Sequence, residues 1–185
     1  MNHFRLVSVS LVALGIASAT SAATVNDATP FGAFQSLCLT PNAEFGAVKA
    51  AAGAWRDTEV IGASTLPGVT VSDKISKASK AGGVPVTLFA WTGTTKSGVH
   101  VSGCTVRVSK PSFDELQNAA ATYTGFPAQE SAPKKAVFRY TPSATKPTAL
   151  DKSGFDAAAA GEGMDILTVT GDVHGAVLDL LKIKK

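Results

Sequence analysis

The sequence predicts an α+β fold, in which an antiparallel sheet of about four to six strands carries N-terminal helices and a central helix on one face. Helical patterns come first, between residues 29 and 55, and alternating segments rich in β-branched residues follow from residue 84. A further helix start at Ser112 then separates these strands from the last ones. Helices and strands that occupy separate stretches of a chain are typical of this class.

Residues 1–23 have the layout of a secretory signal peptide. A positively charged start that ends at Arg5 precedes an apolar run from Leu6 to Ala17 and a tract of small residues up to Ala23. The apolar run is shorter than the about 20 residues that a membrane-spanning helix needs, and no later stretch is long enough to span a bilayer. We therefore expect residues 24–185 to be one periplasmic or secreted domain without stable membrane insertion.

The balance of charge argues against a nucleic-acid-binding protein. The chain of 185 residues has a formal net charge of +3, and its basic residues form no stripe with interleaved aromatics. The many Ala, Gly, Thr and Val residues are typical of a compact exported domain. We expect the partner to be a protein or a component of the cell envelope, and the residues indicate no cofactor.

The two cysteines, Cys38 and Cys104, are predicted to form a disulfide. An even number of cysteines in an oxidising compartment favours pairing. Because the two positions lie far apart in the sequence, the bridge would close a long loop and contribute roughly 4 kcal/mol. The alternatives are unpaired buried thiols and a catalytic thiol, since two thiolates are too few for a structural zinc site and the pair is not a C-x-x-C redox motif.

Two Thr-Pro pairs predict the starts of two N-terminal helices, at Thr29 and at Thr40. A threonine N-cap satisfies one free amide, and proline at the first helical position loses no hydrogen bond. Cys38 would lie at the junction between the two helices. In the second helix, apolar residues recur at helical spacing: Phe45, Val48, Ala52 and Trp55.

Two strands are predicted over residues 84–91 and 98–108, joined by a hairpin loop over 92–98. Pro85 places the first of them at a strand start or a sheet edge. In the second strand, alternation puts Cys104 on one face and Thr105 on the other. The disulfide would therefore hold the N-terminal helices against the face that carries Cys104.

The C-terminal third is predicted to contain a helix and further strands. Ser112 and Glu115 form a capping box, which predicts a helix that ends before Gly125. A strand over 136–141 and a short helix over 155–160 follow. Residues 164–170 and 176–183 are predicted to form a closing hairpin, although the last segment also fits the period of a helix.

The sequence contains no complete catalytic or metal-binding motif, and the catalytic candidates are therefore restricted to His174 and Asp172. An acid two residues from an imidazole on a tight turn could orient it as a general base. The alternative is that Gly-Asp-x-His-Gly is a turn in which the aspartate bonds its own backbone. A metal site of His100, His174 and Asp172 would need a further ligand, and we expect no metal.

Two further features are candidates for binding. Lys74, Lys77 and Lys80 would share about a third of the circumference of a short helix and could meet an anionic surface. The alternative is a solvated face opposite Ile75. Trp91, at the mouth of the predicted hairpin loop, could stack on a ligand, although a tryptophan in this position can also cover the core.

Several of these motifs occur together in one layout: the signal peptide, Phe34-x-x-x-Cys38, Ala-Gly-Ala-Trp55 at the end of an alanine-rich helix, and Gly103-Cys104-x-Val106. In this layout, which covers mainly residues 31–108, the chain resembles small uncharacterised exported proteins of Gram-negative bacteria. The resemblance implies a periplasmic location and brings no catalytic residues.

From the sequence alone, we expect a non-enzymatic periplasmic or secreted domain that binds its partner through one sheet face or through the 92–98 loop. The second hypothesis is a small hydrolase that uses His174 and Asp172, with Ser102 or another nucleophile brought close by folding. The third is a secreted inhibitor that inserts the 92–98 loop into an enzyme cleft.

Overall fold

The computed structural model describes residues 28–59, 66–110, 112–141, 147–151, 154, 163–172 and 175–184. The predicted signal peptide over 1–23 and the predicted helix over 155–160 lie outside the described residues. Among the described residues, no helix is long and apolar enough to cross a bilayer.

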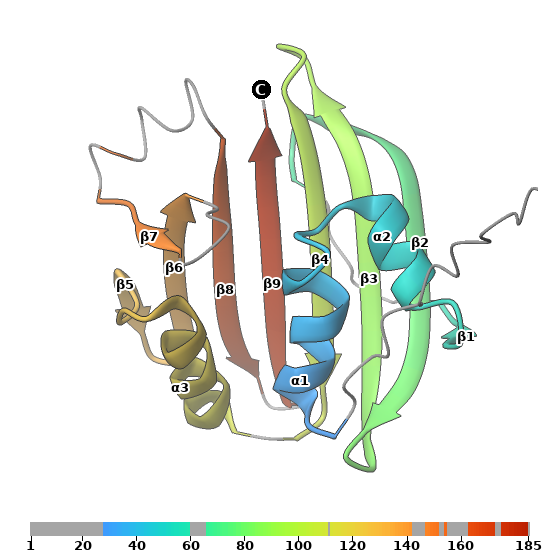
Figure 1. Ribbon diagram of the computed structural model, residues 1–185, viewed down its shortest axis with the longest axis vertical. Coiled ribbons are helices and arrows are strands. Elements are labelled where there is room, and N and C mark those ends of the chain that lie inside the picture. The colour runs from blue at the N-terminus through green and yellow to red at the C-terminus, as the bar shows by residue number, and fades with distance from the viewer. Residues whose placement is uncertain are drawn as a thin grey trace, which may run out of the picture.

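The sheet is antiparallel, as predicted, but larger than expected. Within the described ranges it has nine strands in the spatial order β1-β2-β3-β4-β9-β8-β6-β5, with β7 paired to β6 (Figure 1). The strands are β1 (Arg56–Asp57), β2 (Val69–Ala81), β3 (Val84–Thr95), β4 (His100–Val108), β5 (Glu130–Ala132), β6 (Lys135–Thr141), β7 (Thr148–Ala149), β8 (Met164–Asp172) and β9 (Gly175–Lys184). The protein is therefore mostly sheet rather than a balanced mixture of helices and strands.

The helices lie on one face of this sheet, as Figure 1 shows. The N-terminal pair covers the half that contains β2, β3 and β4, and α3 contacts β8 and β9. We call the covered side the helix face and the other side the opposite face. The helical elements are α1 (Pro30–Phe34), the one-turn π-helix η1 (Gln35–Leu39), α2 (Phe45–Ala51) and α3 (Phe113–Thr124).

Two of the three predicted helix starts are confirmed. The Thr29 side chain accepts a hydrogen bond from the Gly32 amide at the start of α1, and Ser112 and Glu115 form both bonds of the capping box of α3. The start at Thr40 is wrong, because Thr40 ends η1 and α2 begins only at Phe45. Between them, Asn42 and Ala43 have φ values of 54° and 51°, so the chain turns sharply before it becomes helical again.

The core lies between the helix face and the helices. The strands contribute buried apolar residues at alternate positions, as the pleat requires. The helices contribute the other side of the core, including Phe34, Val48 and Leu116. On the sheet, the main core residues are Val86, Leu88, Ala90, Cys104, Val106, Val108, Phe138, Leu167, Val169, Leu178 and Leu180.

The C-terminal segment is a strand, which resolves the choice between strand and helix. β8 and β9 form a hairpin in register from Met164 opposite Ile183 to Asp172 opposite Gly175. β9 then pairs with β4, so the last strand of the described chain occupies the middle of the sheet. This central position joins the β2–β4 half of the sheet to the β5–β8 half.

Candidate functional site

The helix face changes from apolar to polar towards the end of the sheet at which β9 finishes. The last apolar row of laterally adjacent residues consists of Ala90, Cys104, Leu180, Leu167 and Phe138. One step further along the same face, the row consists of Thr92, Ser102, Lys182, Asp165 and Tyr140. We call this second set the polar row. Polar groups on the core-facing side of a sheet are uncommon unless they are paired or serve a function.

The centre of the polar row is a buried ion pair. Lys182 Nζ lies 3.4 Å from Asp165 Oδ1, and the two side chains are only 4% and 3% exposed. Burial raises the pKa of Asp165 above its usual value, and the neighbouring Lys182 opposes this shift. Burial likewise lowers the pKa of Lys182, and Asp165 opposes that shift. Each group therefore needs the other, because either charge alone would be costly in this environment.

Two tyrosines border the ion pair on the side of α3. Tyr140 belongs to the polar row and is buried, and Tyr123 is partly buried on α3. Burial raises the pKa of both phenols, and the negative charge of Asp165 adds to the effect. Both tyrosines therefore stay protonated over the ordinary pH range and place uncharged side chains beside the ion pair.

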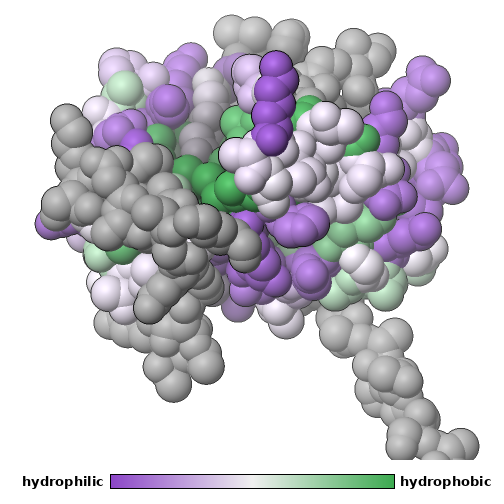
Figure 2. Space-filling view, turned by 90° about the horizontal axis from the view of Figure 1, so that it is seen from above, coloured by the Kyte–Doolittle hydropathy of each residue, from purple (hydrophilic) through white to green (hydrophobic). Residues whose placement is uncertain are grey.

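A hollow opens on the other side of the ion pair. Its volume is about 280 Å³, and it lies between the N-terminus of α2 and the ends of β3, β4 and β9. Figure 2, which views this end from above, shows hydrophilic residues over much of the described surface, with a small hydrophobic area between them. The lining residues are Glu44, Thr92, His100, Val101, Ser102, Lys182 and Lys184.

The hydrogen-bonding groups of the hollow are only partly used within the protein. Lys184 Nζ lies 3.9 Å from Glu44 Oε1, and both side chains are more than half exposed. Thr92 Oγ1 donates to the Val101 carbonyl at 3.4 Å. Among the described residues, the structure gives the side chains of His100 and Ser102 no hydrogen-bond partner. The hollow can therefore offer hydrogen-bond donors and one loosely paired cation to a small molecule.

The predicted disulfide is confirmed. Cys38 and Cys104 are joined, with their Cα atoms 5.6 Å apart, and both are fully buried. Cys38 belongs to η1 and Cys104 to the helix face of β4, as the sequence analysis expected. The described part of the chain contains no free cysteine, and the bridge has a structural position below the hollow rather than a place in its lining.

Trp91 does not lie at the mouth of a loop. β3 continues to Thr95 and β4 starts at His100, so Trp91 is in mid-strand and is 3% exposed. It faces the opposite side of the sheet, where its ring covers Gly103: a Cβ atom at that glycine would come within 2.3 Å of the indole Nε1. Trp91 thus covers a second small apolar cluster, with Phe89 and Val101.

The three predicted binding lysines do not share a face, because they belong to a strand and not to a helix. All three lie on β2, where a spacing of three residues sends neighbouring lysines to opposite sides. Lys74 lies opposite Trp91 and therefore on the opposite face, whereas Lys77 lies opposite Leu88 on the helix face. Lys77 forms an ion pair with Asp57 of β1 at 2.8 Å. Lys80 is exposed on the same side as Lys74.

Of the two catalytic candidates, the structure describes Asp172, which is not part of the lining of the hollow. Asp172 lies at the end of β8, 3.2 Å from Arg107 Nη1, on the opposite face of the sheet from Ser102. His174 lies outside the described residues. Among the residues that the structure describes, no group of three or more His, Cys, Asp or Glu side chains could hold a metal ion.

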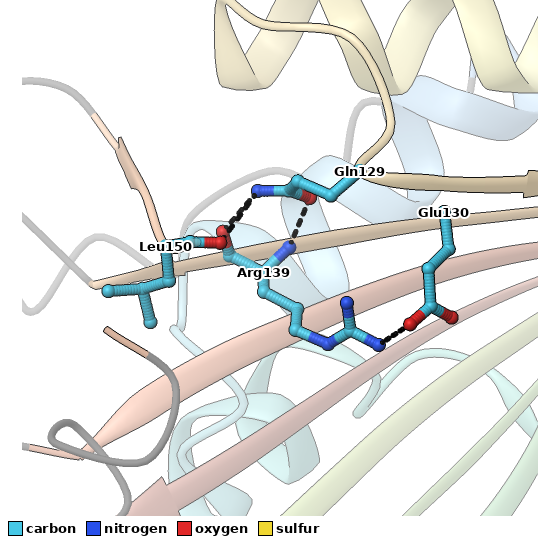
Figure 3. Close-up of polar contacts among 4 residues, drawn as sticks. All are labelled: Gln129, Glu130, Arg139 and Leu150. Atoms are coloured by element: carbon cyan, nitrogen blue, oxygen red, sulfur yellow. Dashed lines mark hydrogen bonds and ion pairs between the residues drawn. The ribbon is translucent and has the colours of Figure 1, made fainter. Parts of the chain in front are cut away.

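A second polar cluster, on the outer side of β6 between its pairings with β5 and β7, has a structural role. The Gln129 side chain donates to the Arg139 carbonyl at 2.7 Å and accepts from the Arg139 amide at 2.8 Å (Figure 3). It thereby completes the edge of β6 between the short strands β5 and β7. The Arg139 guanidinium forms an ion pair with Glu130.

His100 and Ser102 could be named from the sequence, but the polar row could not be recognised there. Two residues carried a usable indication: Asp165 and Lys182 are charged residues inside otherwise apolar strand segments, Met-Asp-Ile and Leu-Lys-Ile. A charged residue whose neighbours two positions away are buried indicates a paired or functional group.

Comparisons with family models, with curated proteins and with solved structures found no match to this chain.

Proposed function

We propose that the processed chain is an exported, non-enzymatic domain that binds a small polar molecule in the hollow beside the polar row. The observation that carries this proposal is the polar row itself. On β3, β4, β9, β8 and β6, the helix face is apolar in the rows beneath the helices and becomes polar where the hollow begins. Concave sites with a few converging polar groups are the usual places for small ligands.

The location outside the cytosol is supported by the disulfide. A buried bridge between distant segments is compatible with an oxidising, extracytoplasmic compartment. The layout of residues 1–23 supports export, and the resemblance to small exported proteins supports the periplasm as the destination.

The melting temperature of the processed protein tests the binding function. It is measured with small molecules grouped by chemistry: carboxylates, phosphates, sugars and amines. We expect at least one class to raise the melting temperature, because a ligand that binds only the folded state stabilises it. Ser102→Leu, which fills the hollow, should abolish the increase. Ser131→Leu, the same change at an exposed position of β5, should preserve it. The proposal fails if no class stabilises the protein or if Ser102→Leu responds as the wild type does.

A hydrolase is the second candidate, and one observation favours it. Lys182 lies directly across from Ser102, and burial lowers the pKa of Lys182. A lysine with a lowered pKa can accept a proton from a serine hydroxyl. The rate at which the protein releases nitrophenol from nitrophenyl acetate or nitrophenyl phosphate distinguishes a hydrolase from a non-enzymatic binding domain. A non-enzymatic domain gives the same rate for wild type and Ser102→Ala, and a clear loss of rate in the variant would reverse the ranking.

A further inference from the structure

The charges around the hollow are compensated unequally. Lys182 is held by Asp165 in a pair that is almost completely buried. Lys184, by contrast, is 56% exposed, and its nearest carboxylate oxygen, on Glu44, is 3.9 Å away. A pair with this separation and exposure contributes little. Lys184 is therefore the cation of the hollow that a ligand can engage without breaking a buried interaction.

Two further side chains with hydrogen-bond donors, His100 and Ser102, lie near Lys184. His100 lies directly opposite Lys184 in the pairing of β4 with β9, and Ser102 lies two residues further along the same face of β4. Side chains directly opposite each other in an antiparallel pair have Cβ atoms about 5 Å apart, and diagonal neighbours are within about 8 Å. Three side chains with hydrogen-bond donors thus lie close enough together to contact the same carboxylate or phosphate group.

Glu44 is the acidic side chain among those that line the hollow. It is the N-cap residue of α2, but its side chain makes no capping hydrogen bond, and it is 62% exposed. Its carboxylate can therefore move away from Lys184 at little cost. A cationic ligand would have Glu44 as a partner but would also face the ammonium group of Lys184, which makes this charge type less favourable.

We propose that the hollow binds the oxyanion group of a small molecule, a carboxylate or a phosphate, between Lys184, His100 and Ser102, and that Glu44 competes with this group for Lys184. This inference rests on the proposed binding function and specifies the chemistry of its ligand. It gives Glu44 an inhibitory role, so that removing its charge strengthens binding. A merely structural ion pair between Glu44 and Lys184 would not have this effect.

The test is a titration of the processed, ¹⁵N-labelled protein, followed by NMR at constant ionic strength. The probes are succinate, inorganic phosphate, ethanolamine and glucose. We expect saturable shifts of the amide signals of His100, Ser102 and Lys184 with succinate or phosphate. The probe with the lower Kd identifies the carboxylate or the phosphate as the preferred group.

Three variants test the roles of the charges. Glu44→Gln should lower the Kd of the better anion about threefold, because it removes a weak competing interaction. Lys184→Met should raise the Kd about tenfold or more, because it removes a charge-assisted hydrogen bond. Lys49→Met, a change of the same charge at an exposed position of α2, should leave the Kd within about twofold.

The possible failures are distinguishable. If ethanolamine or glucose binds in the hollow and the anions do not, the inference about the ligand is wrong while the proposed binding function stands. If no probe of any class shifts these signals, both are wrong. If Glu44→Gln weakens anion binding, or if Lys184→Met binds as tightly as wild type, the assigned roles of these residues are wrong. The dispersion of the amide spectrum shows for each variant that the fold is intact.

Discussion

At the scale of single residues, the buried pair of Asp165 and Lys182 couples the candidate site to stability. Both side chains are almost inaccessible, and each lies on a strand in the middle part of the sheet. Their mutual attraction offsets the loss of hydration, but it does not make the pair strongly stabilising. The pair keeps a polar environment at the inner end of the hollow, where an apolar pair would extend the core.

Removing one member of this pair should be much more harmful than removing both. Lys182→Met leaves the Asp165 carboxyl buried without its partner, and we expect it to lower the free energy of unfolding by about 3–5 kcal/mol. In the double variant Lys182→Met, Asp165→Leu, apolar side chains replace both groups, and we expect most of this loss to be recovered. Urea unfolding at pH 7 measures both values. Equal losses in the single and double variants would contradict the pairing.

The burial of Asp179 predicts how the stability of the protein depends on pH. It lies on the opposite face of β9 and accepts a hydrogen bond from Thr105 Oγ1 at 2.7 Å. Burial raises the pKa of Asp179 above its usual 3.8, and the bond from Thr105 opposes this shift. Because the folded protein then keeps this proton to a higher pH than the unfolded chain, the contribution of Asp179 to stability is present below pH 3.8 and is lost as the pH rises through the folded pKa.

The effect of Asp179→Asn on the free energy of unfolding should therefore become more favourable as the pH rises. The difference in unfolding free energy between the variant and wild type should shift in favour of the variant between about pH 3 and pH 7, because asparagine carries no charge that burial can penalise. Urea unfolding at the two pH values gives this difference. Asp114→Asn is the matched control: Asp114 is exposed in the first turn of α3, where its negative charge is favourable, so this variant should lose stability at pH 7. A difference for Asp179→Asn that does not change with pH would refute the interpretation.

At the scale of secondary-structure elements, the edge of β6 is completed by a side chain. The amide of Gln129 bonds both backbone groups of Arg139, in the gap between β5 and β7 (Figure 3). Uncovered edges of strands can pair with other chains, and natural sheets are commonly protected against this. The Gln129 side chain supplies the acceptor for the Arg139 amide, and its amide group is a second donor to the Arg139 carbonyl beside the Leu150 backbone amide.

Gln129→Ala should expose the Arg139 amide to solvent. We expect faster hydrogen exchange at this amide and a loss of about 1 kcal/mol in the free energy of unfolding, because one backbone donor loses its partner. Amide exchange followed by NMR measures the first effect and urea unfolding the second. Glu130→Gln, which removes only the ion pair with the Arg139 side chain, should leave the exchange of this amide unchanged. Unchanged exchange in Gln129→Ala would contradict the proposed edge protection.

The elements that the sequence predicts well are those with local, specific patterns. The capping box at Ser112 and the hairpin of β8 and β9 depend on residues close together in the chain, and both are confirmed. β2 was missed because its lysines, at every third position, resemble a helical pattern, and because most of its residues are polar or small. The β3–β4 loop was predicted too long, since Thr92 to Thr95 look like turn residues but pair with β4 or β2.

At the scale of the whole molecule, an antiparallel sheet with helices on one face was predictable, but the size of the sheet, its predominance over the helices and the order of its strands were not. β1 and β7 have two residues each, which is too short for any periodic pattern, and the insertion of β9 between β4 and β8 depends on long-range pairing. The same insertion creates the candidate site, because it brings Lys182 and Lys184 beside Ser102 and His100. Residues so distant in the sequence carry no local indication that they meet.

The disulfide connects this architecture to the compartment in which the protein matures. It joins η1 to β4 across a sequence separation of 66 residues and is a covalent cross-link between the N-terminal helices and the sheet. A loop of this length contributes roughly 4 kcal/mol in the chain-entropy model. The free energy of unfolding of an ordinary domain is about 5–15 kcal/mol, so the disulfide would supply a large part of it.

Cys38→Ser should therefore lower the melting temperature by about 10 °C, because each kcal/mol corresponds to roughly 2–4 °C in a domain of this size. The Cys104 thiol of the variant is buried in the folded state, so its alkylation is tested in denaturant without reductant, where the variant should react and wild type should not. The same assay on wild-type protein taken directly from the cell envelope tests export. A protein that matured in an oxidising compartment gives no alkylation, whereas two reactive thiols in that material would contradict both the bridge in the cell and the proposed location.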